Sequence, residues 1–241
     1  MRGKFLLPPI SRKFHPTSRI QQPIVLLWSE EGRFLGSRIM HYCITSLTGE
    51  SLGITDGSFF LGGLAPDLHS YMGPSNYYRT HFSFRNDEGL TETDYDLFER
   101  KYFVDDVSPF HLGYYFHIIS DDIWKHKIYY RKIKGLEPHK KEVALKKNYR
   151  DFWRLNGKII DHHSLVLQEL APIAVEMDEI DHQHFPKLIQ ELYRDFKLKD
   201  EASNEDLEIL DLTEVLSVIE SSVRSCLGAY RRLTGEVSIG E

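Results

Sequence analysis

Proline placement constrains the fold of this chain more than any other sequence feature. Six of its ten prolines and nine of its sixteen glycines fall within the first eighty residues, so this first third is predicted to consist of turns and short elements. Proline fits the first turn of a helix and disrupts a helix interior, so widely spaced prolines bracket helices. After residue 90 the remaining prolines are Pro109, Pro138, Pro172 and Pro186. This spacing predicts helices that begin near residues 109, 138 and 186, the second of them ending before residue 172.

The last segment of the chain carries the clearest helical pattern. Asp211 and Glu214 have the spacing of a capping box, in which the first side chain accepts a hydrogen bond from the backbone three residues later. The apolar residues that follow form one stripe, which consists of Leu212, Val215, Leu216, Ile219, Val223, Cys226, Leu227 and Tyr230. No run of alternating polar and apolar residues indicates a strand. We therefore expect an all-α helical bundle with a loop-rich N-terminal third.

Composition places the chain among ordinary globular proteins. With 241 residues, of which 41% are hydrophobic and 27% charged, it can bury a large core, which excludes wholesale disorder. Its longest uncharged apolar run near the N-terminus, Pro23 to Ser29, is too short to cross a membrane. Two cysteines, Cys43 and Cys226, are too few for a disulfide framework, so we expect a reducing, cytoplasmic location.

The first 39 residues are expected to lie outside the globular part. They contain scattered basic residues but lack the apolar core and cleavage site of a secretory signal. Met40 is followed at once by a patterned helix, His41 to Leu52. We therefore expect residues 1–39 to be a disordered extension or the product of a misassigned start, and residues 40–241 to form one helical domain.

Charge is unevenly distributed along the chain. The formal net charge is -6, yet residues 125–158 hold twelve Lys or Arg and three acids, whereas residues 176–241 hold sixteen acids and seven bases. A basic middle can attract phosphate-bearing substrates, although such runs ordinarily form a solvated helix face. The acidic total argues against a general nucleic-acid-binding protein.

Four side chains with metal-binding chemistry stand on predicted turns and helices. His117 and Asp121 lie four residues apart on the helix expected from Pro109, so both project from one face. Asp67 ends a tight turn, and His81 follows fourteen residues later. Histidine nitrogens and carboxylate oxygens are ligands that zinc accepts. A buried hydrogen bond between His117 and Asp121 explains that pair equally well, because a carboxylate among aromatic neighbours needs a compensating partner.

Further polar residues have simpler explanations. Asp122 and His126 form a second pair four residues apart, but His126 lies on a different face from His117 and is expected at the surface. His163 and Asn156 share the apolar stripe of the second predicted helix, and most simply belong to the core.

Four segments stand in a distinctive order and spacing. They are His41, Ala65-Pro66-Asp67, Thr80-His81-Phe82 and the run from Leu112 to Asp121, which reads LGYYFHIISD. Together they resemble the zinc-dependent phospholipase C family, whose all-helical fold is shared with the P1-type nucleases. The resemblance covers roughly residues 40–165 and looks closest to the short, unsecreted members of the family.

The resemblance implies one to three zinc ions, with two favoured. Asp67, His81, His117 and Asp121 would ligate one ion, and His41 would serve a neighbouring ion with a shared Asp121. In the secreted members the next helix supplies a histidine–glutamate pair, which this chain lacks.

Residues from the same region are the candidates to complete such a site. Asp151, Asn156 and His163 stand on the second predicted helix and are candidates to replace the missing pair. Asp122 is a candidate to ligate a metal or to fix the orientation of an imidazole.

With metals in place, the expected chemistry is hydrolysis of a phosphoric ester. Zinc lowers the pKa of a bound water to about 7, and a pair of ions about 3.5 to 4 Å apart can hold the attacking and leaving oxygens. Asp67 is our catalytic candidate, because a carboxylate on a turn can both ligate a metal and orient the water. The expected partner is a small phosphoester, either a phospholipid head group or a nucleotide.

Two other functions have the same sequence features. A nuclease or nucleotidase acting on single-stranded nucleic acid is a less favoured alternative, and it would use the basic side chains of Lys140, Lys147, Arg150, Arg154 and Lys158. A non-enzymatic helical protein with a structural metal site would show the same ligand spacing, because spacing does not encode an open coordination position. No sequence pattern indicates an oligomeric state.

Overall fold

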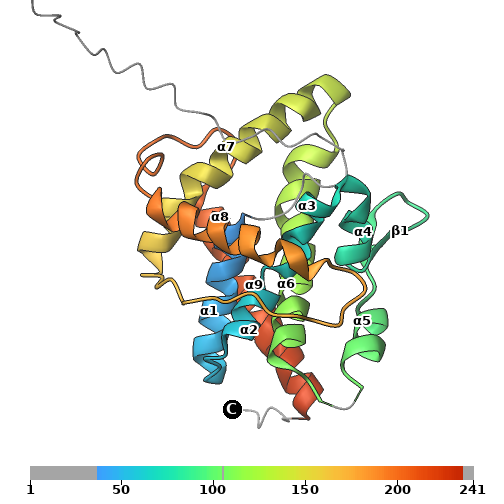
Figure 1. The fold of residues 1–241 in the computed structure, drawn as a ribbon. Helices are drawn as coiled ribbons and strands as arrows, with labels where there is room; N and C mark the ends of the chain where they lie inside the picture. The colour runs from blue at the N-terminus through green and yellow to red at the C-terminus, as the bar shows by residue number, and fades with distance from the viewer. Residues whose placement is uncertain (1–36, 105, 236–241) are drawn as a thin grey trace, which may run out of the picture.

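The computed structural model describes residues 37–104 and 106–235, and nearly all of the regular structure in them is helical (Figure 1). The elements in chain order are α1 (Arg38–Leu52), α2 (Gly57–Gly62), η2 (Ala65–Leu68), α3 (His69–Met72), η3 (Pro74–Asn76), α4 (Tyr77–Thr80), β1 (Ser83–Arg85), β2 (Thr91–Thr93), α5 (Tyr95–Tyr102), α6 (Pro109–Trp124), η4 (Lys125–Lys134), α7 (Pro138–His162), η5 (His182–His184), α8 (Phe185–Lys197) and α9 (Leu212–Thr234). Of the four η segments, η4 is a π-helix and the others are 3-10 helices. The predicted all-α class is confirmed, and the described part of the first third consists largely of short elements.

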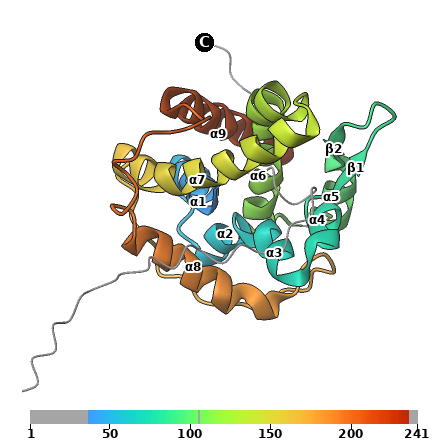
Figure 2. The same cartoon turned by 90° about the horizontal axis from the view of Figure 1, so that it is seen from above.

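Helices α1 and α6 occupy the middle of the molecule. In the view of Figure 2, α7 crosses over α1, α9 lies to one side of α1 and α6, α8 lies to the other, and α3, α4 and α5 close a third side. Helix α6 packs against α2, α9 and α1, and α1 also packs against α7 and α9. Large side chains such as Phe59, Tyr114 and Phe116 fill the space between these helices. A polar side chain on the inner faces of α1 and α6 is therefore removed from water.

Helix α1 begins at Arg38, three residues before its expected start. The Ser37 hydroxyl accepts a hydrogen bond from the backbone N–H of Met40 at 3.1 Å, which caps the helix. Ile39 is fully buried, and the Arg38 guanidinium pairs with two carboxylates of α8. A boundary between residues 39 and 40 would therefore cut into the helix. The rest of the expected extension lies outside the described residues.

Two glycines allow α2 and α6 to touch at the level of the backbone. A Cβ atom on Gly113 would lie 2.1 Å from the carbonyl oxygen of Phe59, and one on Gly62 would lie 2.0 Å from the carbonyl oxygen of Phe110. Only glycine fits at such distances. This contact holds the turn that follows α2 against the N-terminal half of α6.

Helix α6 starts where the sequence predicted. Pro109 occupies its first turn, and the Ser108 hydroxyl accepts a hydrogen bond from the N–H of His111 at 3.2 Å. The helix continues without a break into the π-helix η4, which then leads to α7. π-helical segments are rare and occur frequently at functional sites.

Helix α7 ends at His162, which agrees with the prediction that it ends before Pro172 but makes it shorter than the proline spacing allows. Ser164 has a left-handed backbone with φ of 49°, and the N–H of Leu165 donates to the carbonyl of Ile160 at 2.9 Å, which is the Schellman arrangement for ending a helix. The Tyr42 hydroxyl then bonds to backbone groups of residues 166 and 168. The apolar residues that follow α7 therefore lie on an irregular segment, which tertiary contacts hold in place.

A short antiparallel hairpin is a second departure from the sequence prediction. Strands β1 and β2 pair from Ser83 opposite Thr93 to Arg85 opposite Thr91. Three residues per strand are too few to produce a recognisable alternation of polar and apolar positions. The hairpin projects from the body of the molecule at the right of Figure 1.

Helix α9 follows its predicted pattern. The Asp211 carboxylate accepts a hydrogen bond from the N–H of Glu214 at 2.9 Å, and Val215, Ile219 and Cys226 are buried. None of the helices in the described ranges combines the length and the apolar character needed to cross a bilayer.

Candidate metal centre

Four polar side chains meet in the interior of the protein. His41 comes from α1, His81 directly follows α4, and His117 and Asp121 lie about one turn apart on α6. Each of the four residues has at most 2% of its surface exposed. Such burial is costly for polar groups unless they have partners.

The carboxylate of Asp121 lies at the centre of this cluster. Its Oδ1 atom is 3.2 Å from Nε2 of His41, and its Oδ2 atom is 3.1 Å from Nε2 of His81 and 3.4 Å from Nε2 of His117. The two oxygens of one carboxylate therefore face different imidazoles. The structure thus brings together four of the five side chains that the sequence singled out as metal ligands.

The other ring nitrogen of each histidine is held by a neighbour. Nδ1 of His41 lies 3.0 Å from the Ser120 hydroxyl, and Nδ1 of His81 lies 2.9 Å from the Thr80 hydroxyl. Nδ1 of His117 lies 2.9 Å from the backbone carbonyl of Gly63, at the turn that the glycine contact presses against α6. Hydrogen bonds at one imidazole nitrogen fix the ring and direct the other nitrogen, as in known metal sites. All three Nε2 atoms are thereby directed toward the centre of the cluster.

The atoms that face one another in the cluster have no hydrogen-bond partner. Apart from their ion-pair contacts with one another, Nε2 of His41, His81 and His117 and both carboxylate oxygens of Asp121 are buried without a hydrogen-bond partner. Ligand atoms about 2.0 to 2.1 Å from a tetrahedral zinc ion lie about 3.3 Å from each other. The observed separations of 3.1 to 3.4 Å from Asp121 match this spacing. The residues present therefore fit a metal ion of this size.

Asp67 is a fifth potential metal ligand, and its carboxylate lies at the edge of the cluster. It lies on η2, with Oδ1 3.9 Å from Nε2 of His117, and its side chain is 19% exposed. Among the residues that the structure describes, two sets of three have ligand atoms close enough to share an ion. One consists of His41, His117 and Asp121, and the other of Asp67, His81 and His117. The expected pairing shared Asp121 between two ions, whereas these sets share His117. Because the oxygens of Asp121 face different histidines, its carboxylate can still contact both positions.

Electrostatics in the cluster favour a charged Asp121. Burial raises the pKa of this carboxyl, but the charges of His117 and His41 outweigh that effect and hold the pKa well below its ordinary value. Burial lowers the pKa of His81 to about 4, although Asp121 opposes the shift. The His81 imidazole is therefore neutral at pH 7, which is the form that binds a metal.

Sequence reasoning missed the side chains that support the imidazoles. His69 is buried, its Nδ1 lies 3.1 Å from the carbonyl oxygen of Pro66, and its ring centre is 5.1 Å from that of His81. Its position two residues after Asp67 was a signal that a helical turn would bring it close. Ser120 stands beside Asp121 and Thr80 beside His81 in the sequence, but a hydroxyl next to an aspartate or a histidine is too common to mark a site.

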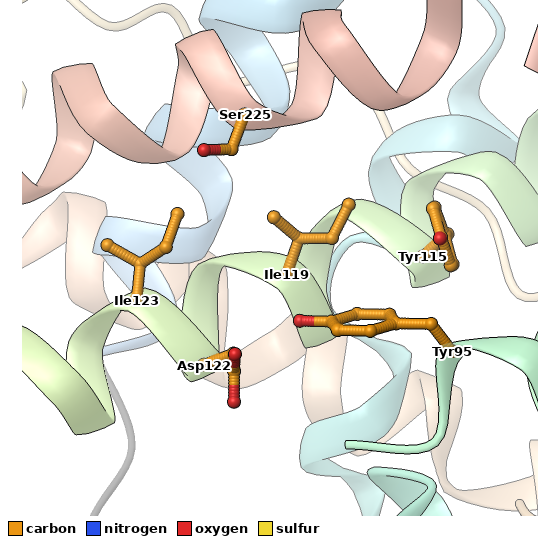
Figure 3. Close-up of a pocket in the computed structure, with 6 residues that line it drawn as sticks. All are labelled: Tyr95, Tyr115, Ile119, Asp122, Ile123 and Ser225. Carbon is orange, nitrogen blue, oxygen red and sulfur yellow. The ribbon is translucent and has the colours of Figure 1, made fainter. Parts of the chain in front are cut away.

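Asp122 lies outside the cluster, contrary to its expected place near the metal. Its carboxylate is 3.0 Å from Nζ of the buried Lys125. It lines a cavity of about 290 Å³, which Figure 3 shows with the Tyr95 hydroxyl close to Asp122. The other lining residues are Tyr115, Ile119, Ile123 and Ser225. His126 is at the surface as predicted, with 56% of its side chain exposed.

Asp151 has a structural role and is not placed as a metal ligand. It is fully buried and accepts hydrogen bonds from the backbone N–H groups of Glu208, Ile209 and Leu210 at 2.8 to 3.0 Å. Its carboxylate thus fastens α7 to the segment that leads into α9.

Asn156 and His163 also fall outside both metal-binding sets. Asn156 is buried, as expected for a core position, and its Oδ1 has no hydrogen-bond partner. His163 lies at the end of α7, where its ring contacts that of His162 with 4.7 Å between centres. Because α7 ends at His162, His163 does not lie within the helix on which the sequence placed it, and it does not share a helix face with Asn156.

Much of the basic segment is neutralised by the acidic one. Arg150 and Arg154 both pair with Glu208, at 2.6 and 2.8 Å, and Nζ of Lys158 donates to the carbonyl oxygen of Ser203. The side chains of these three bases are therefore occupied by contacts within the protein. The idea that they form a nucleic-acid surface together with Lys140 and Lys147 is therefore not supported.

Comparison with known proteins identified no family. No protein-family model matches the chain, and no curated protein or solved structure matches it significantly.

Proposed function

We propose that this protein is a metal-dependent hydrolase of phosphoric esters, with zinc as its metal. One observation carries the proposal, namely that three imidazole nitrogens and two carboxylate oxygens converge in the interior without hydrogen-bond partners. Unsatisfied buried polar atoms are rare in native proteins, and each needs an explanation. A bound cation explains all five atoms at once. The resemblance to the zinc-dependent phospholipase C family, and its P1-nuclease-like bundle, supports the same conclusion.

The side chains divide the work of such a site. His41, His81 and His117 direct their Nε2 atoms toward the centre of the cluster, and their anchored Nδ1 atoms keep the rings from turning away. Asp121 offers one oxygen to each side of the cluster, which favours two ions over one. When bound, zinc lowers the pKa of water so that hydroxide is present near neutral pH.

Asp67 is the catalytic residue that we propose. It is the most exposed member of the cluster, so it marks the side from which a substrate can arrive. A carboxylate there can accept a hydrogen bond from the attacking water and orient it toward phosphorus. The proposed substrate is a small phosphoester, either a phospholipid head group or a nucleotide.

The burial of the cluster favours a second candidate function. The side chains of His41, His81, His117 and Asp121 are at most 3% exposed. A closed site with no open position for water would be structural. In that case the metal would hold α1, α6 and the end of α4 together without catalysis.

Metal analysis combined with an activity assay distinguishes these functions. The hydrolase predicts more than one zinc ion per chain after gentle purification, together with turnover of a chromogenic phosphodiester. Turnover should vanish in His117→Ala while the fold persists, and should survive in the control His126→Ala, since His126 is exposed and outside the cluster. Zinc without hydrolysis of phosphodiesters, phosphomonoesters, lecithin or single-stranded DNA would contradict the enzyme and support the structural site. Absence of zinc would contradict both.

A further inference from the structure

The twelve basic residues of the segment 125–158 fall into two groups in the structure. One group is held by partners within the fold, and it consists of Lys125, Lys127, Lys132, Arg150, Arg154 and Lys158. The second group extends from the last turns of η4 through the first three turns of α7, and it consists of Arg131, Lys134, Lys140, Lys141, Lys146 and Lys147. We call this second group, together with Leu136 and Val143, the basic tip. The junction of η4 and α7 stands at the top of the described chain in Figure 1.

Several charges of the basic tip lack a partner. Within the described ranges, the side chains of Arg131, Lys140 and Lys147 form no hydrogen bond or ion pair, and Arg131 and Lys140 are exposed. Lys146 pairs with Glu142 at 2.6 Å, which is an exposed contact of little strength. The tip therefore carries a local positive charge on a molecule whose formal net charge is -6.

Two exposed apolar side chains lie among these charges. Leu136, at the junction, is 36% exposed and Val143, on α7, is 41% exposed. Lys140, Val143 and Lys147 are spaced three and four residues apart, so at about 100° per residue they share one face of α7. Aliphatic side chains flanked by lysines are typical of surfaces that rest on an anionic membrane, where the apolar groups enter the interface and the cations contact lipid phosphates.

The same observations argue against a nucleic acid as the partner. Proteins that bind single strands present exposed aromatic rings on which bases stack. The exposed apolar residues of the tip are aliphatic instead. The acidic remainder of the chain would be repelled by any anionic surface, which leaves the tip as the part that approaches first.

We propose that the basic tip docks the protein on membranes that contain anionic lipids. Docking uses the free charges of Arg131, Lys140 and Lys147, and it uses Leu136 and Val143 as shallow apolar contacts. Membrane docking does not involve the metal cluster, so it can be tested separately from the proposed hydrolase activity. If both hold, phospholipid becomes the favoured substrate over a free nucleotide.

Co-sedimentation of the full chain with vesicles tests the role of the charges. We expect binding to mixed phosphatidylserine–phosphatidylcholine vesicles, weak binding to pure phosphatidylcholine, and loss of binding at high salt. Each basic residue near the surface contributes about fivefold in affinity, so the triple variant Arg131→Gln, Lys140→Gln, Lys147→Gln should bind about a hundredfold more weakly. The matched control has the same net charge and neutralises exposed bases elsewhere, at Arg194, Lys197 and Arg224. It should bind like the unmodified chain.

A second variant tests the apolar contacts and separates the membrane from a nucleic acid. Leu136→Ser with Val143→Ser should weaken vesicle binding while circular dichroism shows an unchanged helical content. Equal losses in the triple variant and its control would overturn the proposal, because they would indicate only a net-charge effect. Binding of single-stranded DNA that exceeds vesicle binding and is weakened by the triple variant would also overturn it. So would the absence of any difference between anionic and neutral vesicles.

Discussion

Asp151 offers a quantitative test of how the two halves of the chain are fastened together. Its carboxylate is fully buried and accepts backbone hydrogen bonds from Glu208, Ile209 and Leu210. In Asp151→Asn the amide group keeps one acceptor oxygen but directs its own N–H bonds at backbone donors. Hydrogen bonds to a charged group contribute about 1.5 to 3 kcal/mol each, and the half-buried donors of Glu208 and Ile209 can recover water, whereas that of Leu210 is buried. We therefore expect a loss of about 3 to 5 kcal/mol in the free energy of unfolding.

Urea denaturation followed by circular dichroism measures this loss. With a slope of about 2 kcal/mol per molar, the midpoint should fall by about 2 M while the slope stays unchanged. Asp161→Asn is the matched control, since Asp161 lies on the same helix but is exposed and, among the described residues, its side chain pairs with Lys199 alone. Its midpoint should move by less than about 0.5 M. The folded Asp151→Asn protein should retain its metal. A small change in stability together with loss of metal would refute the structural role and restore Asp151 as a ligand.

Three further perturbations give distinct outcomes. A chain that begins at Met40 loses buried Ile39 and the cap of α1, so its free energy of unfolding should fall by about 2.5 to 4 kcal/mol relative to the full chain; equal midpoints in urea would refute this. In Gly113→Ala the added methyl group would meet a carbonyl oxygen, so stability should fall by about 1 to 3 kcal/mol and metal content should fall with it, whereas Gly228→Ala has free space and should unfold at slightly higher temperature. Hydrogen bonds from two arginines lower the pKa of Glu208 to about 2, so it stabilises the fold above about pH 4.5 and this contribution is lost as the pH falls toward 2; the stability of Glu208→Gln, measured by urea denaturation across this window, should depend less on pH.

Local signals in the sequence predicted the helices that have them. The cap at Ser108 with Pro109 fixed the start of α6, and Asp211 fixed the start of α9, because these signals act within one helical turn. The end of α7 could not be predicted in the same way. Ser164 adopts a left-handed backbone that glycine usually supplies, and Tyr42 from a distant helix holds the segment beyond it.

Only the part of the candidate site whose residues lie close together in the sequence was predictable from their spacing. His117 and Asp121 share a helix face by periodicity alone, whereas His41, Asp67 and His81 could be linked to them only through a family resemblance. The carbonyl of Gly63 that orients His117 has no sequence signature, since every residue has a carbonyl group. Asp151 had the right chemistry for a ligand, and only the fold shows that backbone N–H groups occupy it.

Anomalous X-ray diffraction at the zinc absorption edge, from crystals of protein grown with zinc, tests the central claim most directly. The account predicts a peak about 2.0 to 2.2 Å from Nε2 of His81, Nε2 of His117 and the carboxylate of Asp121, with a second peak beside Nε2 of His41. It would be contradicted by crystals in which these imidazoles donate hydrogen bonds directly to Asp121 and no anomalous peak lies between them.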